Sequence, residues 1–203
     1  MKILLATGNK DKVREIKEFY KEYEIYALGE VLEPFEIIED GDSFKANALI
    51  KARAVYEKLR EKGLEREFVS LSDDSGISVE ALGGAPGIYS ARYSGEGATD
   101  AKNRAKMIAE LHARDLKTSP AFYTACIAIA SPFGEFCAHG FMHGAVIDEE
   151  RGSNGFGYDF MFVPRGYSQT VGELAPSVKE AISHRTRGLA LARYILKSIE
   201  DAK

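Results

Sequence analysis

The chain has 203 residues, of which 45% are hydrophobic and 29% charged, and its formal net charge is −4. This balance is typical of a globular protein with a sizeable core, and the negative charge argues against a broad binding surface for DNA or RNA. A single nucleotide needs only a local group of positive charges. No apolar run approaches ~18 residues, so we expect no membrane association through a transmembrane helix. The start, MKILLATGNK, does not resemble a signal peptide, which predicts a cytoplasmic protein.

The expected elements alternate between strands and helices. Apolar residues recur at intervals of three and four where we expect helices, and in short unbroken or alternating runs where we expect strands. Ser43, Thr99 and Ser183 are placed to cap helices. In chain order, we expect a strand at 2–6, a helix at 13–23, a helix at 44–63, a strand at 68–72 that continues after a kink at 77–79, a helix at 100–113, paired strands at 122–131 and 135–147, a strand at 158–164 and a helix at 184–200. This order predicts an α/β fold with a mixed sheet, in one domain over 1–203.

The two cysteines, Cys126 and Cys137, both lie in strand-like runs. In a chain with no signal peptide we expect free, buried thiols rather than a disulfide. No spacing of Cys and His resembles a zinc site. We expect His112, His139 and His143 to be structural or surface groups.

The first polar loop, TGNKDK, lies between the first expected strand and helix. A helix N-terminus offers unpaired N–H groups that suit phosphate, Gly8 allows close approach of the backbone, and Lys10 and Lys12 add positive charge. The segment lacks the Walker spacing. The alternative is an ordinary turn capped by Asn9.

Two acidic segments follow. Asp73 and Asp74 adjoin at a strand end, and burying both charges unpaired would be costly. Mg²⁺ prefers one or two carboxylates together with phosphate oxygens, so one aspartate could bind metal and activate water while the other accepts backbone N–H groups. Glu39, in EDG, could present a further carboxylate. In both segments the alternative is a solvated turn.

Two later segments suit a base. SNGFGYD sets Phe156 and Tyr158 among glycines, and aromatic rings there could stack on a base or simply join the core. Lys179 and the pair His184–Arg185 stand at the head of the last expected helix, where positive charge opposes the helix dipole. That placement suggests an anionic or carbonyl-rich ligand, or else exposed charges that the helix tolerates.

Taken in order, TGNKDK, EDG with SF, NALIKAR, DDSGISVEALGGAPGIYSARYSG, GFGYD and KEAISHR resemble the inosine/xanthosine triphosphate pyrophosphatase family over almost the whole chain. The resemblance implies an elongated mixed sheet with two lobes of helices and a nucleotide cleft between them. It also implies a homodimer, and Mg²⁺-dependent hydrolysis of ITP, dITP and XTP to the monophosphate and pyrophosphate.

The resemblance also implies a role for each matching residue. Asp74 would be the general base and, with Glu39, a metal ligand. The phosphates of the substrate would be bound by Thr7, Gly8, Asn9, Lys10, Asp11 and Lys12, with Lys51 as a further contact. Ser75 would also contact the substrate. The base would be bound by Phe156, Gly157, Tyr158, Asp159, Lys179, His184 and Arg185.

Three positions depart from the family pattern. Ala46 stands where Glu is usual, Glu150 where Pro is usual, and Phe160 where Pro is usual. Ala46 would lie in the first turn of a helix, where Glu could close a capping box, and the other two flank the expected base wall. The alternatives are a Maf-like nucleotide pyrophosphatase with another base preference and a nucleotide-binding regulatory module without catalysis.

Overall fold

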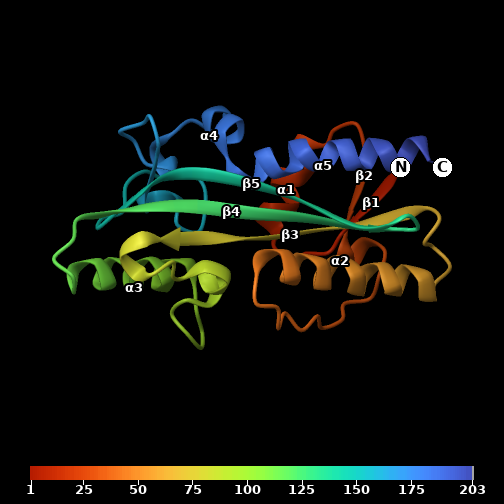
Figure 1. Ribbon diagram of the computed structural model, residues 1–203, viewed down its shortest axis with the longest axis horizontal. Coiled ribbons are helices and arrows are strands. Elements are labelled where there is room, and N and C mark those ends of the chain that lie inside the picture. Colours follow the sequence, from red (N-terminus) through yellow and green to blue (C-terminus); the bar gives the residue numbers. More distant parts are fainter. Residues whose placement is uncertain (203) are drawn as a thin grey trace. The chain divides into compact units, whose positions relative to one another are not determined.

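A computed structural model describes residues 1–202 and contains a mixed α/β fold (Figure 1). Within these residues the strands are β1 (Lys2–Leu5), β2 (Glu24–Ala27), β3 (Phe68–Val79), β4 (Thr118–Ser131), β5 (Gly134–Ile147) and β6 (Phe162–Pro164), and the α-helices are α1 (Lys10–Phe19), α2 (Phe44–Glu61), α3 (Asp100–His112), α4 (Pro176–Ile182) and α5 (His184–Asp201). The strands form one sheet in the order β2-β1-β3-β4-β5-β6. β1 pairs in parallel with β2 and β3, whereas β5 and β6 are antiparallel, so the expected mixed sheet is confirmed.

The chain divides into two compact units, and β3, β4 and β5 each contribute residues to both. Unit 1 contains Met1–Asp74, Ala125–Gly140 and Arg185–Lys203, and unit 2 contains Ser75–Thr124 and Phe141–His184. None of the helices at residues 1–202 is both long and apolar enough to cross a membrane.

Unit 1 buries its strands on both faces. On β1, Ile3 and Leu5 belong to one buried cluster, which also includes residues of α1 and α5. Leu4 belongs to the other cluster, which includes residues of α2. Side chains alternate between the faces of a strand, so an almost continuous apolar run is what two covered faces require. α5 and α2 accordingly lie on opposite sides of the unit 1 strands (Figure 1).

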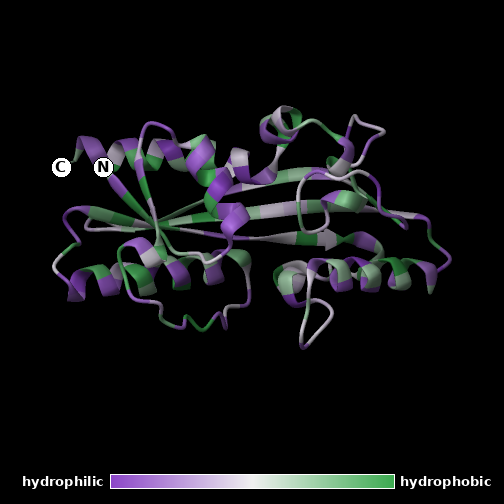
Figure 2. Cartoon of the chain, turned by 180° about the vertical axis from the view of Figure 1, so that it is seen from behind, coloured by the Kyte–Doolittle hydropathy of each residue, from purple (hydrophilic) through white to green (hydrophobic). Residues whose placement is uncertain are grey.

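Unit 2 has a core of its own. Its buried cluster includes Ile77 of β3, Met107 and Leu111 of α3, and Met142 of β5. α3 begins where the sequence predicts, since the Thr99 side chain accepts a hydrogen bond from Lys102 N. Polar and apolar residues alternate along the helices in both units (Figure 2), as expected for helices with one buried face.

Two expected elements are wrong in detail. The kink after Ser72 is absent, because β3 runs unbroken through both aspartates. The strand predicted at 158–164 begins only at Phe162, after a turn of 3₁₀ helix at Asp159–Met161. Asp159 Oδ2 accepts a hydrogen bond from Phe156 N at 3.1 Å, and such local side-chain bonds compete with strand formation. Two short elements, β2 and α4, are not predicted.

Candidate active site

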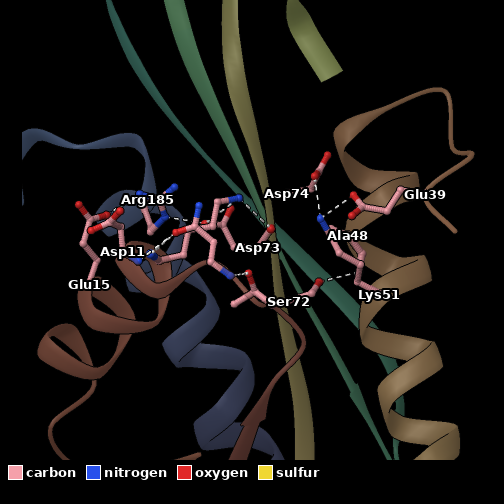
Figure 3. Close-up of polar contacts among 12 residues, drawn as sticks. Asp11, Glu15, Glu39, Ala48, Lys51, Ser72, Asp73, Asp74 and Arg185 are labelled. Atoms are coloured by element: carbon pink, nitrogen blue, oxygen red, sulfur yellow. Dashed lines mark hydrogen bonds and ion pairs between the residues drawn. The ribbon is translucent and has the colours of Figure 1, made fainter. Parts of the chain in front are cut away.

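The two adjacent aspartates of β3 point to opposite sides of the strand. Asp73 faces Arg185 and α1, whereas Asp74 faces Lys51 on α2 (Figure 3). This arrangement follows from the twofold alternation of side chains along a strand. The repulsion inferred from DDSG is therefore relieved by separation, and each carboxylate has cationic partners of its own.

Asp73 forms a buried ionic network with Arg185. Arg185 Nε donates to Asp73 Oδ2 at 2.5 Å, and the two side chains are 4% and 0% exposed. Arg185 Nη1 also donates to Glu15 of α1. Burial lowers the pKa of Arg185, but Asp73 and Glu15 outweigh this effect and raise the pKa above its ordinary value. No motif in the sequence indicated Glu15, which reaches the network from the second turn of α1.

Asp74 and Glu39 share one cation. Lys51 Nζ lies 2.8 Å from Asp74 Oδ1 and 2.9 Å from Glu39 Oε2. Burial raises the pKa of Asp74 although Lys51 opposes the shift. Burial lowers the pKa of Lys51, but the two carboxylates of Asp74 and Glu39 outweigh burial, so its pKa lies above the ordinary value. The three predicted residues are thus brought together by loop 39–41, α2 and β3.

The other oxygen of Asp74 bears on metal binding. Oδ2 is buried and forms no hydrogen bond with any residue in the described part of the chain. A buried carboxylate oxygen without a donor is costly, and a hard cation would satisfy it. The two carboxylates at Lys51 therefore fit the donor set that Mg²⁺ prefers.

The loop that carries Glu39 is held against the start of α2. Gly41 N donates to Asn47 Oδ1 at 2.9 Å, and a Cβ at Gly41 would lie only 2.7 Å from both this oxygen and Ala46 Cβ. Ser43 caps α2 as predicted, accepting from Ala46 N at 3.2 Å. The departure at Ala46 therefore lies where the loop packs closely on the helix.

The TGNKDK loop has the predicted cap at its helix start. Asn9 Oδ1 accepts from Asp11 N at 2.9 Å and Lys12 N at 3.0 Å, and Thr7 Oγ1 accepts from Asn9 N. Gly8 and Lys10 are exposed. Lys12 turns inward, with Nζ 3.2 Å from the carbonyl oxygen of Asp73 and 3.7 Å from its Oδ2. Burial lowers the pKa of Lys12 despite Asp73.

Among the predicted residues of unit 2, a second cluster is formed by Phe156, Asp159, Lys179 and His184. Lys179 Nζ donates to Asp159 Oδ2 at 2.8 Å and lies 4.6 Å from the ring centroid of Phe156. The ring of His184 stacks on Tyr123, with centroids 4.5 Å apart. Tyr123 is a neighbour that the sequence did not indicate. Ser75 is half-buried on β3, immediately after Asp74.

The aromatic residues of GFGYD have different environments. Tyr158 belongs to the core of unit 2, where its hydroxyl donates to Ser90 O at 2.8 Å. Phe156 is only partly buried. Of the two rings considered for stacking, Phe156 is thus the more accessible one.

Arg104 of α3 connects two of the departures from the family pattern. Its Nε lies 2.8 Å from Glu150, and its guanidinium lies 4.6 Å from the ring centroid of Phe160. Nη1 donates to Gly157 O at 2.8 Å, while Gly157 N donates to Asp100 Oδ2 at the same distance. Asp100 and Arg104 are four residues apart and therefore share a helix face, but the sequence could not indicate which loop they would hold.

Solved structures share this fold. A HAM1 protein from Coxiella burnetii matches with a TM-score of 0.83 and 35% identity, over 98% of this chain and 99% of that chain. A structure titled nucleoside-triphosphatase / dITP/XTP pyrophosphatase from Mycobacterium abscessus matches with a TM-score of 0.72 and 39% identity, over 96% and 98% of the two chains.

Sequence comparisons identify the family. The model of the Ham1 family matches residues 3–194, and the chain belongs to that family. A protein named dITP/XTP pyrophosphatase from Campylobacter fetus subsp. fetus is 70% identical over 200 residues, which cover 98% of each chain. The comparisons support the predicted family and lend no support to the Maf-like or regulatory alternatives.

Proposed function

We propose that the protein hydrolyses deaminated purine nucleoside triphosphates, namely ITP, dITP and XTP, to the monophosphate and pyrophosphate. Relatives at high identity carry the name of this activity. The observation that carries the proposal is the buried Asp74 carboxylate, which shares Lys51 with Glu39 and keeps one oxygen without a donor in residues 1–202. Such a group is suited to act on water beside a cation.

Glu39 and Asp74 would hold the metal ion, which we propose to be Mg²⁺. When bound, Mg²⁺ would neutralise the phosphate charge. Lys51 already lies between the two carboxylates, and its ammonium would remain close enough to contact a phosphate oxygen. The proposed site therefore combines two anionic ligands with one fixed positive charge.

Asp74 is the proposed general base for water attack at the α-phosphorus. A base is most effective when its pKa lies near the working pH. Burial raises the pKa of Asp74, so its carboxylate accepts a proton more readily than an exposed aspartate. Asp73 would serve instead as the counter-ion of Arg185, which holds this part of β3 in place.

The triphosphate is assigned to the TGNKDK loop. Lys10 is exposed and Lys12 lies at the Asp73 backbone, so both could steady the leaving pyrophosphate. Asn9 already uses two N–H groups of the helix start. The loop therefore would act through its lysines, Thr7 and the flexible backbone at Gly8.

The base is assigned to Phe156–Asp159 with Lys179, His184 and Arg185. Hypoxanthine and xanthine carry a carbonyl at C6 where adenine carries an amino group, and N–H donors favour the carbonyl. A site built on hydrogen bonds rejects the wrong partner because its donors are left unpaired. Asp73 and Glu15 already engage two nitrogens of Arg185, and these two carboxylates fix the position of its guanidinium.

We further propose that the protein acts in the cytoplasm as a homodimer. This part rests on the resemblance to the pyrophosphatase family. We propose no nucleic acid polymer as a partner, in line with the net charge of −4.

The test is product analysis with Mg²⁺ on ITP, dITP and XTP against ATP, GTP and TTP. We expect monophosphate and pyrophosphate from the first three substrates and little product from the others. Asp74→Asn should lower kcat by about 10²–10⁴-fold, as loss of a general base does, and should retain nucleotide binding. Orthophosphate as the product, or equal turnover of ATP, would refute the proposal.

A further inference from the structure

A second group of metal-ligating side chains lies in unit 1, on the β4–β5 hairpin. It consists of Cys126 on β4 and of Cys137 and His139 on β5. The sulfur atoms and one imidazole nitrogen all lie within 4.8 Å of one another. Both thiols are free. The group has no part in the hydrolysis proposed above.

The hairpin explains why these residues converge. Asp148 N donates to Lys117 O at one end of the strand pair, and a two-residue turn closes the other end. If the strands pair without a bulge from the turn to the Lys117–Asp148 bond, His139 lies directly opposite Cys126. Cys137 is then two residues from His139 along β5, on the same face of the sheet. Opposite and diagonal neighbours on one face are within side-chain reach.

The set has the chemistry of a soft-metal site. Zinc binds sulfur at about 2.3 Å and imidazole nitrogen at about 2.0–2.1 Å, so tetrahedral ligand atoms lie roughly 3.5–3.8 Å apart. Atoms already within 4.8 Å of one another need to approach by only about 1 Å to reach that spacing. We propose that Cys126, Cys137 and His139 form a Zn²⁺ site with three protein ligands and a fourth position for water.

The environment of the three residues provides access for an ion. Cys126 is fully buried, whereas Cys137 and His139 are partly exposed, so an ion can enter from their side. Burial and the neighbouring Cys137 raise the pKa of Cys126 to about 12, and Asp73 and Asp74 add to the shift. On binding, the metal–sulfur bonds replace two S–H bonds and two protons pass to solvent.

Cobalt titration tests this site independently of nucleotide turnover. Co²⁺ is added to tag-free, metal-depleted protein with both thiols reduced, and thiolate-to-cobalt charge transfer is followed in the near ultraviolet. Carboxylate ligands give no such band, so Glu39 and Asp74 do not contribute. We expect saturation at one ion per chain and displacement by Zn²⁺.

Matched variants assign the ligands. Cys137→Ser and His139→Gln are preferred because both positions are partly exposed, and circular dichroism checks their fold. Each should weaken Co²⁺ binding by at least about 100-fold, since even outer-shell changes cost 10–100-fold. His143→Gln, at an exposed position on the same strand, should bind as the wild type does. Absence of the band in reduced wild-type protein, or unchanged affinity in either ligand variant, would overturn the proposal.

Discussion

Replacing Asp73 with asparagine should destabilise the protein more than the same change at Asp74. Asp73 is fully buried against Arg185, whose side chain is 4% exposed. Removing one partner of a buried pair typically costs 3–5 kcal/mol, because the other charge is left uncompensated. Arg185 retains Glu15, so we expect the lower end, about 3 kcal/mol.

Asp74→Asn is the matched control. Because burial raises the pKa of Asp74 in the folded state, any stability linked to its titration is present at low pH and is lost as the pH rises through that raised pKa. Asparagine removes the cost of burying a negative charge at this position, and its side-chain oxygen can still accept a hydrogen bond from Lys51. The loss of the buried charge pair with Lys51 opposes this gain, so we expect a smaller loss of stability than Asp73→Asn causes.

Thermal and urea unfolding measure the difference. For a chain of 203 residues, each kcal/mol shifts Tm by about 2–4 °C, so Asp73→Asn should lower Tm by roughly 6–12 °C. Equal losses in the two variants, or an unchanged Tm for Asp73→Asn, would refute the division of roles between the aspartates.

Three further predictions concern the site. In the metal-free protein the pKa of Asp74 should lie above the ordinary aspartate value of about 3.9, and Lys51→Met should raise it further because Asp74 loses a cation; an Asp74 pKa that NMR titration finds unmoved by Lys51→Met would contradict this. Arg104→Met should raise the KM for ITP several-fold with little effect on kcat, because the glycine-rich loop loses a hydrogen bond; initial-rate kinetics that show a loss only in kcat would count against a positioning role. Gly155→Ala should lower Tm, since φ is +87° and the new Cβ would lie 2.2 Å from Asp159 Oδ2; a melting curve like the wild type's would disprove the clash.

The sequence predicted the longer elements because their periodicity reflects burial. α2 and α3 begin at the predicted caps, and the apolar run of β4 belongs to a sheet buried on both faces in unit 1. β2 was not predicted because its four residues, EIYA, are too short a run to indicate a strand by themselves, and its place is fixed by pairing with β1. The kink after Ser72 was inferred from adjacent charges and glycine, whereas β3 runs unbroken and both aspartates form ion pairs with residues of other elements.

The candidate site, like the fold, could be predicted from the sequence only in part. Motif order indicated Glu39, Lys51 and Asp74, and these residues do meet. Nothing local in the sequence distinguishes Asp73 from Asp74, because the distinction depends on which helix covers each face of β3. The partner of Cys126 likewise comes from another strand, so no spacing within one segment could reveal the Cys126–Cys137–His139 group.

The most direct test of the proposed mechanism is the position of attack by water. ITP would be hydrolysed with Mg²⁺ in water enriched in oxygen-18. The products would then be separated, and their masses measured by mass spectrometry. The account predicts the label in inosine monophosphate and none in pyrophosphate, with Asp74→Asn slowing its incorporation. Label in pyrophosphate, or in orthophosphate released from the γ-position, would contradict attack at the α-phosphorus.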